Sequence, residues 1–329
     1  MQPARTPGAV SFPHGVMFHQ FHGEDHAPQQ GSIDAEALER IISRFGSRLI
    51  SADQWLDRLE QGRLGSTDVC LTFDDNLRCQ FDVAAPVLEQ AGIRAFWFIA
   101  TCGLEGPPPR FEIYRAFREQ YFDTIEDFYD AFLWAIRRSV HAKAVAESLT
   151  GFNAKTFLAA FSFYSDSDRR FRYIRDEVLT PAQYDELMLA LMASLQADPE
   201  RIGREVYMGR DELLRLHRRG HILGLHSHTH PMRLAKLAPD EQRREYQANA
   251  ATLQRLTGVS PVAMAHPCNS YSLVTLGILR ELGIRAGFCS NMEYANPSEL
   301  EFARVDHAVL LRELGGAGVS AQCTVDSAQ

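Results

Sequence analysis

The sequence predicts an α/β fold built on a parallel sheet or barrel. Three observations favour it: short apolar runs typical of buried strands alternate with helical patterns, the helical patterns end at glycines, and one long helical segment interrupts the alternation. The 329 residues are 45% hydrophobic and 23% charged, which excludes a disordered or fibrous chain and allows a sizeable core.

Five apolar runs predict buried strands, and four of them lead into residues with reactive side chains. The first run precedes His19, the second ends at Asp74 and Asp75, and the fourth and fifth lead into His226 and His266. Ligands of parallel α/β folds sit at the carboxyl ends of strands, so these residues are the candidates for a site. The runs are 16–18, 69–73, 95–99, 222–225 and 262–265.

Helical patterns separate these runs. The first pattern has Ser32 or Asp34 as its N-cap, and each pattern is followed by a glycine that suits a left-handed C-cap. The patterns cover 34–45, 82–91, 210–219, 241–257 and 271–282.

The middle of the chain is aromatic-rich, helical in pattern and poor in strands. We expect a barrel domain over 1–103 and 204–329 and a helical insertion over 104–203, in which Thr180 and Pro181 begin one helix. The insertion could be a lid, a substrate-recognition domain or the interface of a homo-oligomer, and the sequence leaves these alternatives open. The last dozen residues, 318–329, are small and polar and are expected to fray.

Charge and hydropathy argue against nucleic acid and the membrane as partners of this protein. The net charge is −8 without a basic run, which argues against a nucleic-acid partner. No apolar stretch reaches the roughly 18 residues of a membrane span. The first residues lack the pattern of a secretory signal, and the six cysteines form no CxxC pair, so we expect a cytoplasmic protein with reduced thiols.

Two clusters carry the chemistry. Asp74 and Asp75 would repel each other unless a cation lies between them, although one of them could instead cap the next helix. His226, His228 and His230 stand at even spacing, so two imidazoles could reach one ion in an extended or a helical geometry. Two histidines with one carboxylate leave coordination positions open, as in a catalytic metal site.

Together these motifs resemble the polysaccharide deacetylases with the NodB homology domain, carbohydrate esterase family 4 and its relatives. The first motif of that family matches 72–75, the second matches 226–230, the third resembles 263–271 and the fourth resembles 302–306. The run 207–221 resembles the approach to the second motif. The resemblance covers about residues 12–103 and 204–310 and skips the insertion.

The resemblance implies a distorted (β/α) barrel of about seven parallel strands. It also implies one divalent metal, most often zinc, with cobalt, nickel or manganese as alternatives. The ligands would be Asp75, His226 and His230, and Asp74 would be the general base for the attacking water. A backbone N–H around Cys268 or Tyr271 would stabilise the oxyanion.

Two departures from the family pattern leave roles open. The third motif lacks the arginine that pairs with the base, and Arg304 or Arg78 could replace it. The late histidine that protonates the leaving amine has no clear match, because His307 lies too close to the fourth motif. His19 and His22, which follow the first strand, are the candidates for that role, and His22 is also expected among the residues that bind substrate.

The remaining candidates would contact the substrate. His228 could be a third ligand or, as we favour, a residue that orients a ligand. We interpret Cys268 as a wall of the substrate pocket, because no neighbouring base would activate its thiol. The other residues expected to bind substrate come from the third motif: His266, Pro267, Asn269 and Tyr271.

The predicted activity is metal-dependent removal of an N-acetyl or N-formyl group from an amino sugar. A cytoplasmic enzyme would act on a soluble or lipid-linked precursor of a surface polysaccharide, and a nucleotide sugar would suit the arginines of the insertion. The alternatives are a catalytically decayed sugar-binding protein and another metal hydrolase such as a phosphoesterase. A two-metal phosphoesterase site would need more carboxylates than these motifs provide.

Overall fold

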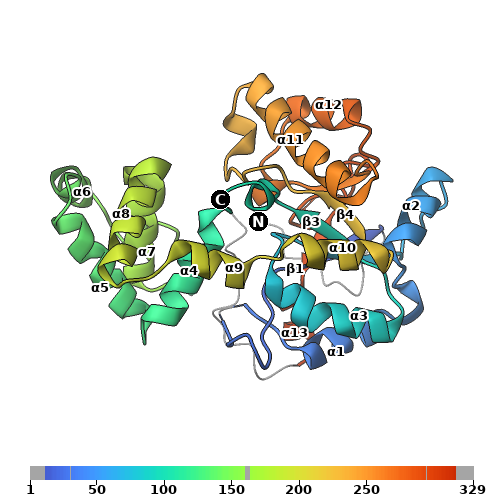
Figure 1. Ribbon diagram of the computed structural model, residues 1–329, viewed down its shortest axis with the longest axis horizontal. Coiled ribbons are helices and arrows are strands. Elements are labelled where there is room, and N and C mark those ends of the chain that lie inside the picture. Colours follow the sequence, from blue (N-terminus) through green and yellow to red (C-terminus); the bar gives the residue numbers. More distant parts are fainter. Residues whose placement is uncertain (1–11, 30, 160–163, 294, 316–329) are drawn as a thin grey trace. The chain divides into compact units, whose positions relative to one another are not determined.

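Seven parallel strands are present in this computed structural model, which describes residues 12–29, 31–159, 164–293 and 295–315 (Figure 1). They pair in the order β6-β5-β4-β3-β2-β1-β7, and every neighbouring pair is parallel. The strands are β1 (His14–Phe18), β2 (Val69–Phe73), β3 (Phe96–Ile99), β4 (Ile222–Leu225), β5 (Ala263–Ala265), β6 (Ala286–Phe288) and β7 (Arg304–Asp306).

The two outer strands approach each other, so the sheet is a nearly closed barrel. Phe288 of β6 bridges in parallel to Phe302, just before β7. The Cys289 N–H donates to the Phe302 carbonyl at 2.8 Å, and the Phe302 N–H donates to the Gly287 carbonyl at 2.8 Å. The barrel expected from the family resemblance is therefore confirmed.

The five predicted strands are found with their starts shifted by two residues at most. The positions of β6 and β7 were not predicted, because β6 has a single large apolar side chain and two of the three residues of β7 are charged. β7 even begins with a charged residue, Arg304, which is buried in the barrel.

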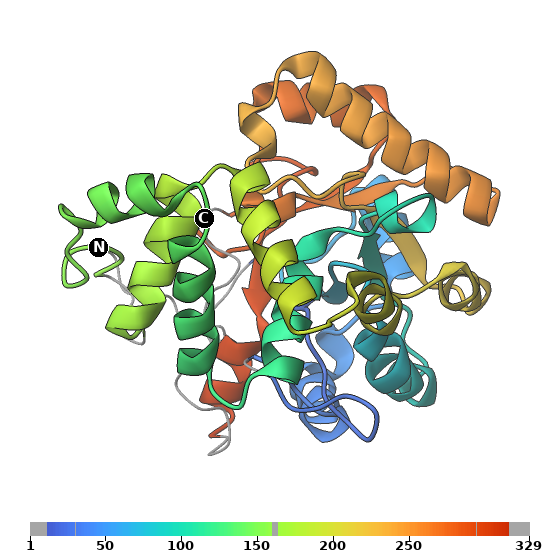
Figure 2. The same cartoon turned by 60° about the vertical axis from the view of Figure 1, so that its left-hand side comes forward.

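Helices surround the barrel, and most follow the predicted patterns. α11 and α12 lie side by side on one side of the strands, and α1 lies beside α13 on the other (Figures 1 and 2). The helices and helical turns are α1 (Ala35–Phe45), η2 (Gly46–Arg48), α2 (Ala52–Glu60), η3 (Gln80–Ala84), α3 (Ala85–Ala91), η4 (Cys102–Leu104), α10 (Arg210–Arg218), η6 (Leu234–Lys236), α11 (Pro239–Thr257), η7 (Pro267–Asn269), α12 (Leu273–Glu281) and α13 (His307–Glu313).

Local signals explain where these helices begin and end. Of the two N-cap candidates of α1, Asp34 is the cap, because its carboxylate accepts from the Ala37 N–H at 2.8 Å. Gly92 and Gly258 end α3 and α11 in the left-handed conformation, as predicted. Gly46 does not, because its ψ is −127° and the chain continues into the turn η2.

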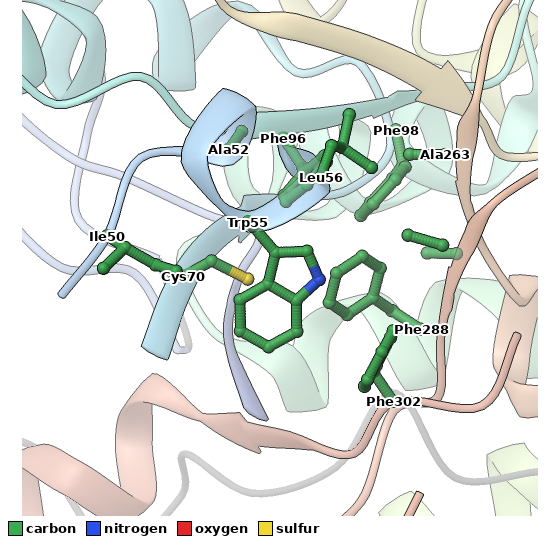
Figure 3. Packing of buried hydrophobic residues seen from close by; sticks show 12 residues of the cluster. Ile50, Ala52, Trp55, Leu56, Cys70, Phe96, Phe98, Ala263, Phe288 and Phe302 are labelled. Atoms are coloured by element: carbon green, nitrogen blue, oxygen red, sulfur yellow. The ribbon is translucent and has the colours of Figure 1, made fainter. Parts of the chain in front are cut away.

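Aromatic side chains from β3, β6 and α2 form a buried cluster in the barrel unit. Phe96 and Phe98 lie two residues apart on β3, so they share a face. They pack with Phe288, and the Trp55 ring from α2 lies 5.1 Å from Phe302, edge to face (Figure 3). The cluster also includes Cys70 of β2 and Ala265 of β5, so it holds together strands whose carboxyl ends carry the site.

The described residues divide into two compact units. The barrel unit runs to Pro109 and resumes at Tyr207, and Arg110–Val206 form a helical unit. Thr180 and Pro181 begin α8 as predicted, and the Thr180 hydroxyl accepts from the Gln183 N–H. The helices of this unit are α4 (Arg110–Tyr121), α5 (Ile125–Arg137), α6 (Ala142–Leu149), α7 (Asp166–Tyr173), η5 (Ile174–Val178), α8 (Pro181–Ser194) and α9 (Pro199–Val206).

In the part of the chain that the structure describes, no helix combines the length and the apolar character needed to cross a bilayer. The predicted fraying of 318–329 concerns residues outside the described ranges.

Candidate active site

Three side chains converge at the carboxyl ends of β2 and β4. Asp75 follows β2, and His226 and His230 follow β4. The Asp75 Oδ1 atom lies 3.3 Å from His226 Nε2 and 3.2 Å from His230 Nε2, and the two Nε2 atoms are 3.2 Å apart. These three atoms form a nearly equilateral triangle of metal-ligating donors.

The triangle fits a four-coordinate divalent cation. Ligand atoms about 2.0–2.1 Å from a tetrahedral zinc ion lie about 3.3–3.4 Å from one another, close to the separations found here. One carboxylate oxygen and two imidazole nitrogens are also the donors that zinc and related ions prefer. Three protein ligands would leave a fourth position open for water or substrate.

The ring of His226 is already oriented for this purpose. Its Nδ1–H donates to the Ala265 carbonyl at 3.0 Å, which leaves the Nε2 lone pair facing the triangle. Its backbone N–H donates to the Asn249 side chain at 3.0 Å. The His230 N–H donates to the Ser227 hydroxyl at 3.1 Å, so a side chain within the loop 226–230 stabilises that loop.

The backbone around the site adopts uncommon conformations. Asp75 has φ of 74°, Ser227 has 58° and His230 has 55°, values that side chains other than glycine rarely adopt. Cys268 and Asn269, after β5, have φ of 49° and 52°. Such backbone costs about 1–3 kcal/mol per residue and clusters at functional sites, so the sequence maintains these turns at the expense of stability.

Asp74 is held by Arg304 in a buried ion pair. The guanidinium donates to both Asp74 oxygens at 2.7 and 2.8 Å, and also to the Thr72 hydroxyl and the Cys289 carbonyl. A Cβ on Gly15 would lie only 3.0 Å from the Arg304 side chain, so this glycine of β1 makes room for it. Of the two arginines proposed as partner of the base, Arg304 is the one that binds Asp74.

His19 lies beside both carboxylates. Its Nε2 atom is 3.8 Å from Asp74 Oδ2 and 3.7 Å from Asp75 Oδ2, and the side chain is partly exposed. The buried Gln80 Nε2 group donates to the backbone carbonyls of His19 and Asp74 at 2.8 and 2.6 Å, and so ties the ends of β1 and β2 together. Gln80 begins the π-helical turn η3, a feature frequent at functional sites.

His228 points to another partner. Its Nδ1 atom lies 3.0 Å from the Thr101 hydroxyl, and His228 is not part of the metal-ligating triangle. The Glu245 carboxylate accepts from its backbone N–H at 2.9 Å. This arrangement places His228 outside the triangle, and its predicted role of orienting a ligand stays a prediction.

The third motif includes β5 and the turn η7 that follows it. His266 is buried, donates from Nε2 to the Leu300 carbonyl at 2.8 Å and stacks on Tyr271 with ring centroids 4.1 Å apart. Pro267 and Cys268 follow in the turn η7, and the Asn269 carboxamide accepts from the Ser290 N–H at 3.0 Å. The Tyr271 hydroxyl contacts the Cys289 thiol at 3.5 Å.

Three further candidates have partners elsewhere. The His22 Nδ1 atom lies 2.9 Å from the Ser32 hydroxyl, Arg78 pairs with Glu212, and both ring nitrogens of His307 face backbone carbonyls. These contacts place none of the three in the triangle or in the Asp74 pair.

Burial and neighbouring charges shift the pKa values of several side chains at the site. Burial raises and Arg304 lowers the pKa of Asp74, and the net shift is downward, so the carboxylate stays ionised. Burial lowers and Asp74 and Asp75 raise the pKa of His226, with a net upward shift. Burial lowers the pKa of His266 to about 4, so this ring is neutral near pH 7.

Residues that the sequence did not single out support this geometry. Asn249, Thr101, Gln80 and Glu245 all contact backbone or side chains of the motif residues. A single asparagine or glutamine within a helix carries no recognisable signal, so only the structure reveals them.

Part of the chain matches a known protein family. A family model described as polysaccharide deacetylase matches residues 200–287, which include His226, His230 and the third motif. Comparison with the sequences of curated proteins finds no match.

Three solved structures share the fold. The Streptococcus pyogenes deacetylase PplD in complex with acetate is 15% identical, covers 92% of this chain and 97% of its own, and has a TM-score of 0.53. IcaB from Ammonifex degensii is 13% identical, with coverages of 90% and 91% and a TM-score of 0.53. A de-N-acetylase from Aggregatibacter actinomycetemcomitans is 12% identical, with coverages of 90% and 95% and a TM-score of 0.52.

Identities this low show the fold, and the family model adds a sequence match over one part of the chain. The chain thus carries the polysaccharide deacetylase signature over residues 200–287 on the barrel fold that these deacetylases share.

Proposed function

We propose that this protein is a metal-dependent hydrolase that removes an N-acetyl or N-formyl group from an amino sugar. The observation that carries the proposal is the triangle of Asp75, His226 and His230 beside the ionised Asp74. The family signature over 200–287 and the shared fold support the same activity.

Asp75, His226 and His230 would hold one divalent cation, for which zinc is our first candidate. When bound, the cation would supply Lewis-acid polarisation of the amide carbonyl and of the attacking water. Asp74 would accept the proton from that water at a carboxylate oxygen. Arg304 keeps Asp74 ionised and fixed, because both guanidinium arms hold its oxygens.

The other polar groups would complete the hydrolysis. His19 lies within 4 Å of both carboxylates, so its Nε2 atom could give a proton to the departing amine. Backbone N–H groups around Cys268 and Tyr271 would donate to the oxyanion of the tetrahedral intermediate. The strained turn η7 would aim those groups, since Cys268 and Asn269 both have positive φ.

Within the class of amino sugars, the substrate that we propose is a nucleotide sugar or a related precursor of a surface polysaccharide. This part of the proposal is a prediction from the sequence alone, and the contacts that the structure shows for three arginines of the insertion lie within the helical unit. Arg110 and Arg115 lie near the carboxylates of Asp185 and Glu112, whereas Arg138 covers the half-exposed Trp134 ring. The cytoplasmic location stays a prediction, which fractionation of cells would test.

Release of acetate tests the activity. The zinc-loaded protein is incubated with a nucleoside-diphosphate N-acetylhexosamine and, separately, with N-acetylglucosamine oligomers. We expect acetate from at least one substrate and a loss of about a hundredfold or more in rate for Asp74→Asn, since a general base contributes that much. Asp53→Asn, in the half-exposed pair with Arg94, is the matched control and should keep the rate.

The outcomes separate the alternatives. Hydrolysis of the oligomers alone would overturn the nucleotide-sugar assignment and keep the activity. Binding of a sugar without any acetate or formate release would support a sugar-binding protein instead. An unchanged rate in Asp74→Asn would remove Asp74 from the mechanism.

A further inference from the structure

A buried asparagine on α11 joins two strand ends at the site. Asn249 is 0% exposed, and its side chain makes three hydrogen bonds. Its Oδ1 atom accepts from the His226 N–H at 3.0 Å, and its Nδ2 group donates to the Ile99 carbonyl and the Thr101 hydroxyl, both at 2.9 Å. The carboxamide therefore bridges the end of β3 and the first residue after β4.

Packing alone does not account for this residue. Asparagine is a poor helix former, and a buried carboxamide is favourable only when its hydrogen bonds are made. Here three of its four hydrogen-bonding capacities are used, and all three reach out of its own helix. A leucine or alanine would suit the helix better but would leave the His226 N–H without this acceptor.

The contact with His226 bears directly on the metal-ligating triangle. The backbone N–H of His226 is fixed by Asn249, and its ring Nδ1–H is fixed by the Ala265 carbonyl. Two anchors on one residue set both where the Cα lies and how the ring turns. The Nε2 atom then has one position relative to Asp75 and His230.

A second branch runs from Asn249 to His228. The buried Thr101 hydroxyl accepts from Asn249, and it lies 3.0 Å from His228 Nδ1. Because a buried hydroxyl proton needs an acceptor, the hydroxyl donates to Nδ1, and the ring proton of His228 then sits on Nε2. The chain of bonds thus gives His228 a defined tautomer and removes Nδ1 as a metal ligand.

Glu245, one turn before Asn249 on α11, holds the other side of the loop. Its carboxylate accepts from the backbone N–H groups of His228 and Thr229 at 2.9 and 2.8 Å. α11 therefore fixes residues 226–229 at both ends through two side chains that share a helix face.

We propose that Asn249 is a positioning residue that presets the His226 ligand and, through Thr101, the tautomer of His228. This inference rests on the metal-binding part of the proposed function. It predicts that Asn249 controls the affinity for the cation without touching it.

Metal affinity of Asn249→Ala tests the inference. Zn²⁺ and Co²⁺ affinities are measured by competition with a chromophoric chelator for the wild type, Asn249→Ala and Gln242→Ala. Gln242 is the matched control, because it is a buried carboxamide on the same helix that bonds Leu237 and Thr275 and not the histidine loop. We expect the affinity to fall about 10- to 100-fold in Asn249→Ala and to stay within about threefold in Gln242→Ala.

The melting temperature without metal reports the purely structural effect of each variant. If both variants melt earlier by similar amounts but only Asn249→Ala loses affinity, the positioning role is supported. An equal loss of affinity in both variants would assign the effect to α11 as a whole and overturn it. Should Asn249→Ala not fold, Asn249→Ser leaves a smaller cavity and gives the same comparison.

The outcomes also separate this inference from the function on which it rests. A wild type that binds neither ion would remove the metal site itself. A wild type that binds the ion, with Asn249→Ala binding it equally well, would remove only the role of Asn249. Nitrogen NMR of the His228 ring gives a readout independent of metal, because a proton on Nδ1 rather than Nε2 would contradict the hydrogen-bond chain.

Discussion

Replacing Arg304 by methionine should strongly destabilise the barrel, because it leaves the Asp74 carboxylate buried without its counter-charge. Arg304 and Asp74 are 1% and 2% exposed. The substitution removes two bonds to Asp74 and one each to Thr72 and Cys289. Removing one partner of a buried ion pair costs about 3–5 kcal/mol, a large share of the stability of most domains.

Urea unfolding of the metal-free protein at pH 7 measures this loss. The matched control is Arg94→Met, because Arg94 also grips an aspartate, Asp53, with two hydrogen bonds of 2.8 and 2.6 Å. Those two side chains are 41% and 39% exposed. A solvated pair contributes about 1 kcal/mol or less, so the two variants should differ several-fold in the free energy of unfolding that they lose.

The pH dependence of the loss has a definite sign. In the wild type the pKa of Asp74 lies below its usual value, so the folded state is favoured while the group is ionised. Without Arg304, burial would raise the pKa of Asp74, and the folded variant would take up a proton more readily than the unfolded chain. Lowering the pH from 7 toward 4.5 should therefore reduce the difference between Arg304→Met and the wild type.

The double variant completes the cycle. Asp74→Asn removes the charge that Arg304 compensates, so Arg304→Met should cost less in that background than in the wild type. A loss below about 1 kcal/mol for Arg304→Met, or equal losses in both backgrounds, would refute the view that a tightly coupled buried pair holds the base.

Two further predictions concern the barrel. Burial lowers the pKa of His221 to about 4, and its Nδ1 atom accepts from the Ala95 N–H. Between pH 6.5 and 4 the unfolded chain takes up a proton at this residue before the folded protein does, so the free energy of unfolding should fall by about 3 kcal/mol. His221→Asn should make the free energy of unfolding less dependent on pH in this range, and an unchanged slope would contradict the prediction. Gly224→Ala should lose about 1–3 kcal/mol in urea unfolding, because the new Cβ would lie 2.6 Å from the Ala263 carbonyl. Gly277→Ala in α12 meets nothing within 4 Å and should gain about 0.5–1 kcal/mol, so equal effects of the two substitutions would contradict the packing described.

The residues of the candidate site could be located from sequence because they follow strands, and the family resemblance singled out the three ligands among them. His226 comes directly after an apolar run, Asp75 comes one residue later after another, and the carboxyl ends of parallel strands meet at one edge of the sheet. His230 follows at a spacing that lets both imidazoles reach one ion. The barrel fold followed from the same alternation together with the family resemblance.

The partner of Asp74 could not be decided from sequence. Arg304 lies 230 residues away on a three-residue strand, and nothing local distinguishes it from Arg78. The choice depends on β7 lying beside β1, a pairing that only the folded barrel creates.

The supporting residues escaped prediction for a different reason. Asn249 and Gln80 act through hydrogen bonds to backbone groups, whose positions depend on the turns after β1, β2 and β4. Those turns contain residues with positive φ, such as Asp75 and Ser227. A positive φ is expected from sequence mainly at glycine or asparagine, so these turns could not be foreseen.

Metal content is the measurement that tests the central claim most directly. The wild type and His230→Ala are purified without chelators, supplied with zinc, dialysed and analysed for bound metal. We predict about one equivalent in the wild type and a loss of most of it in His230→Ala, because two of three protein ligands cannot hold the ion tightly. Equal metal in both proteins, or none in either, would contradict a site formed by Asp75, His226 and His230.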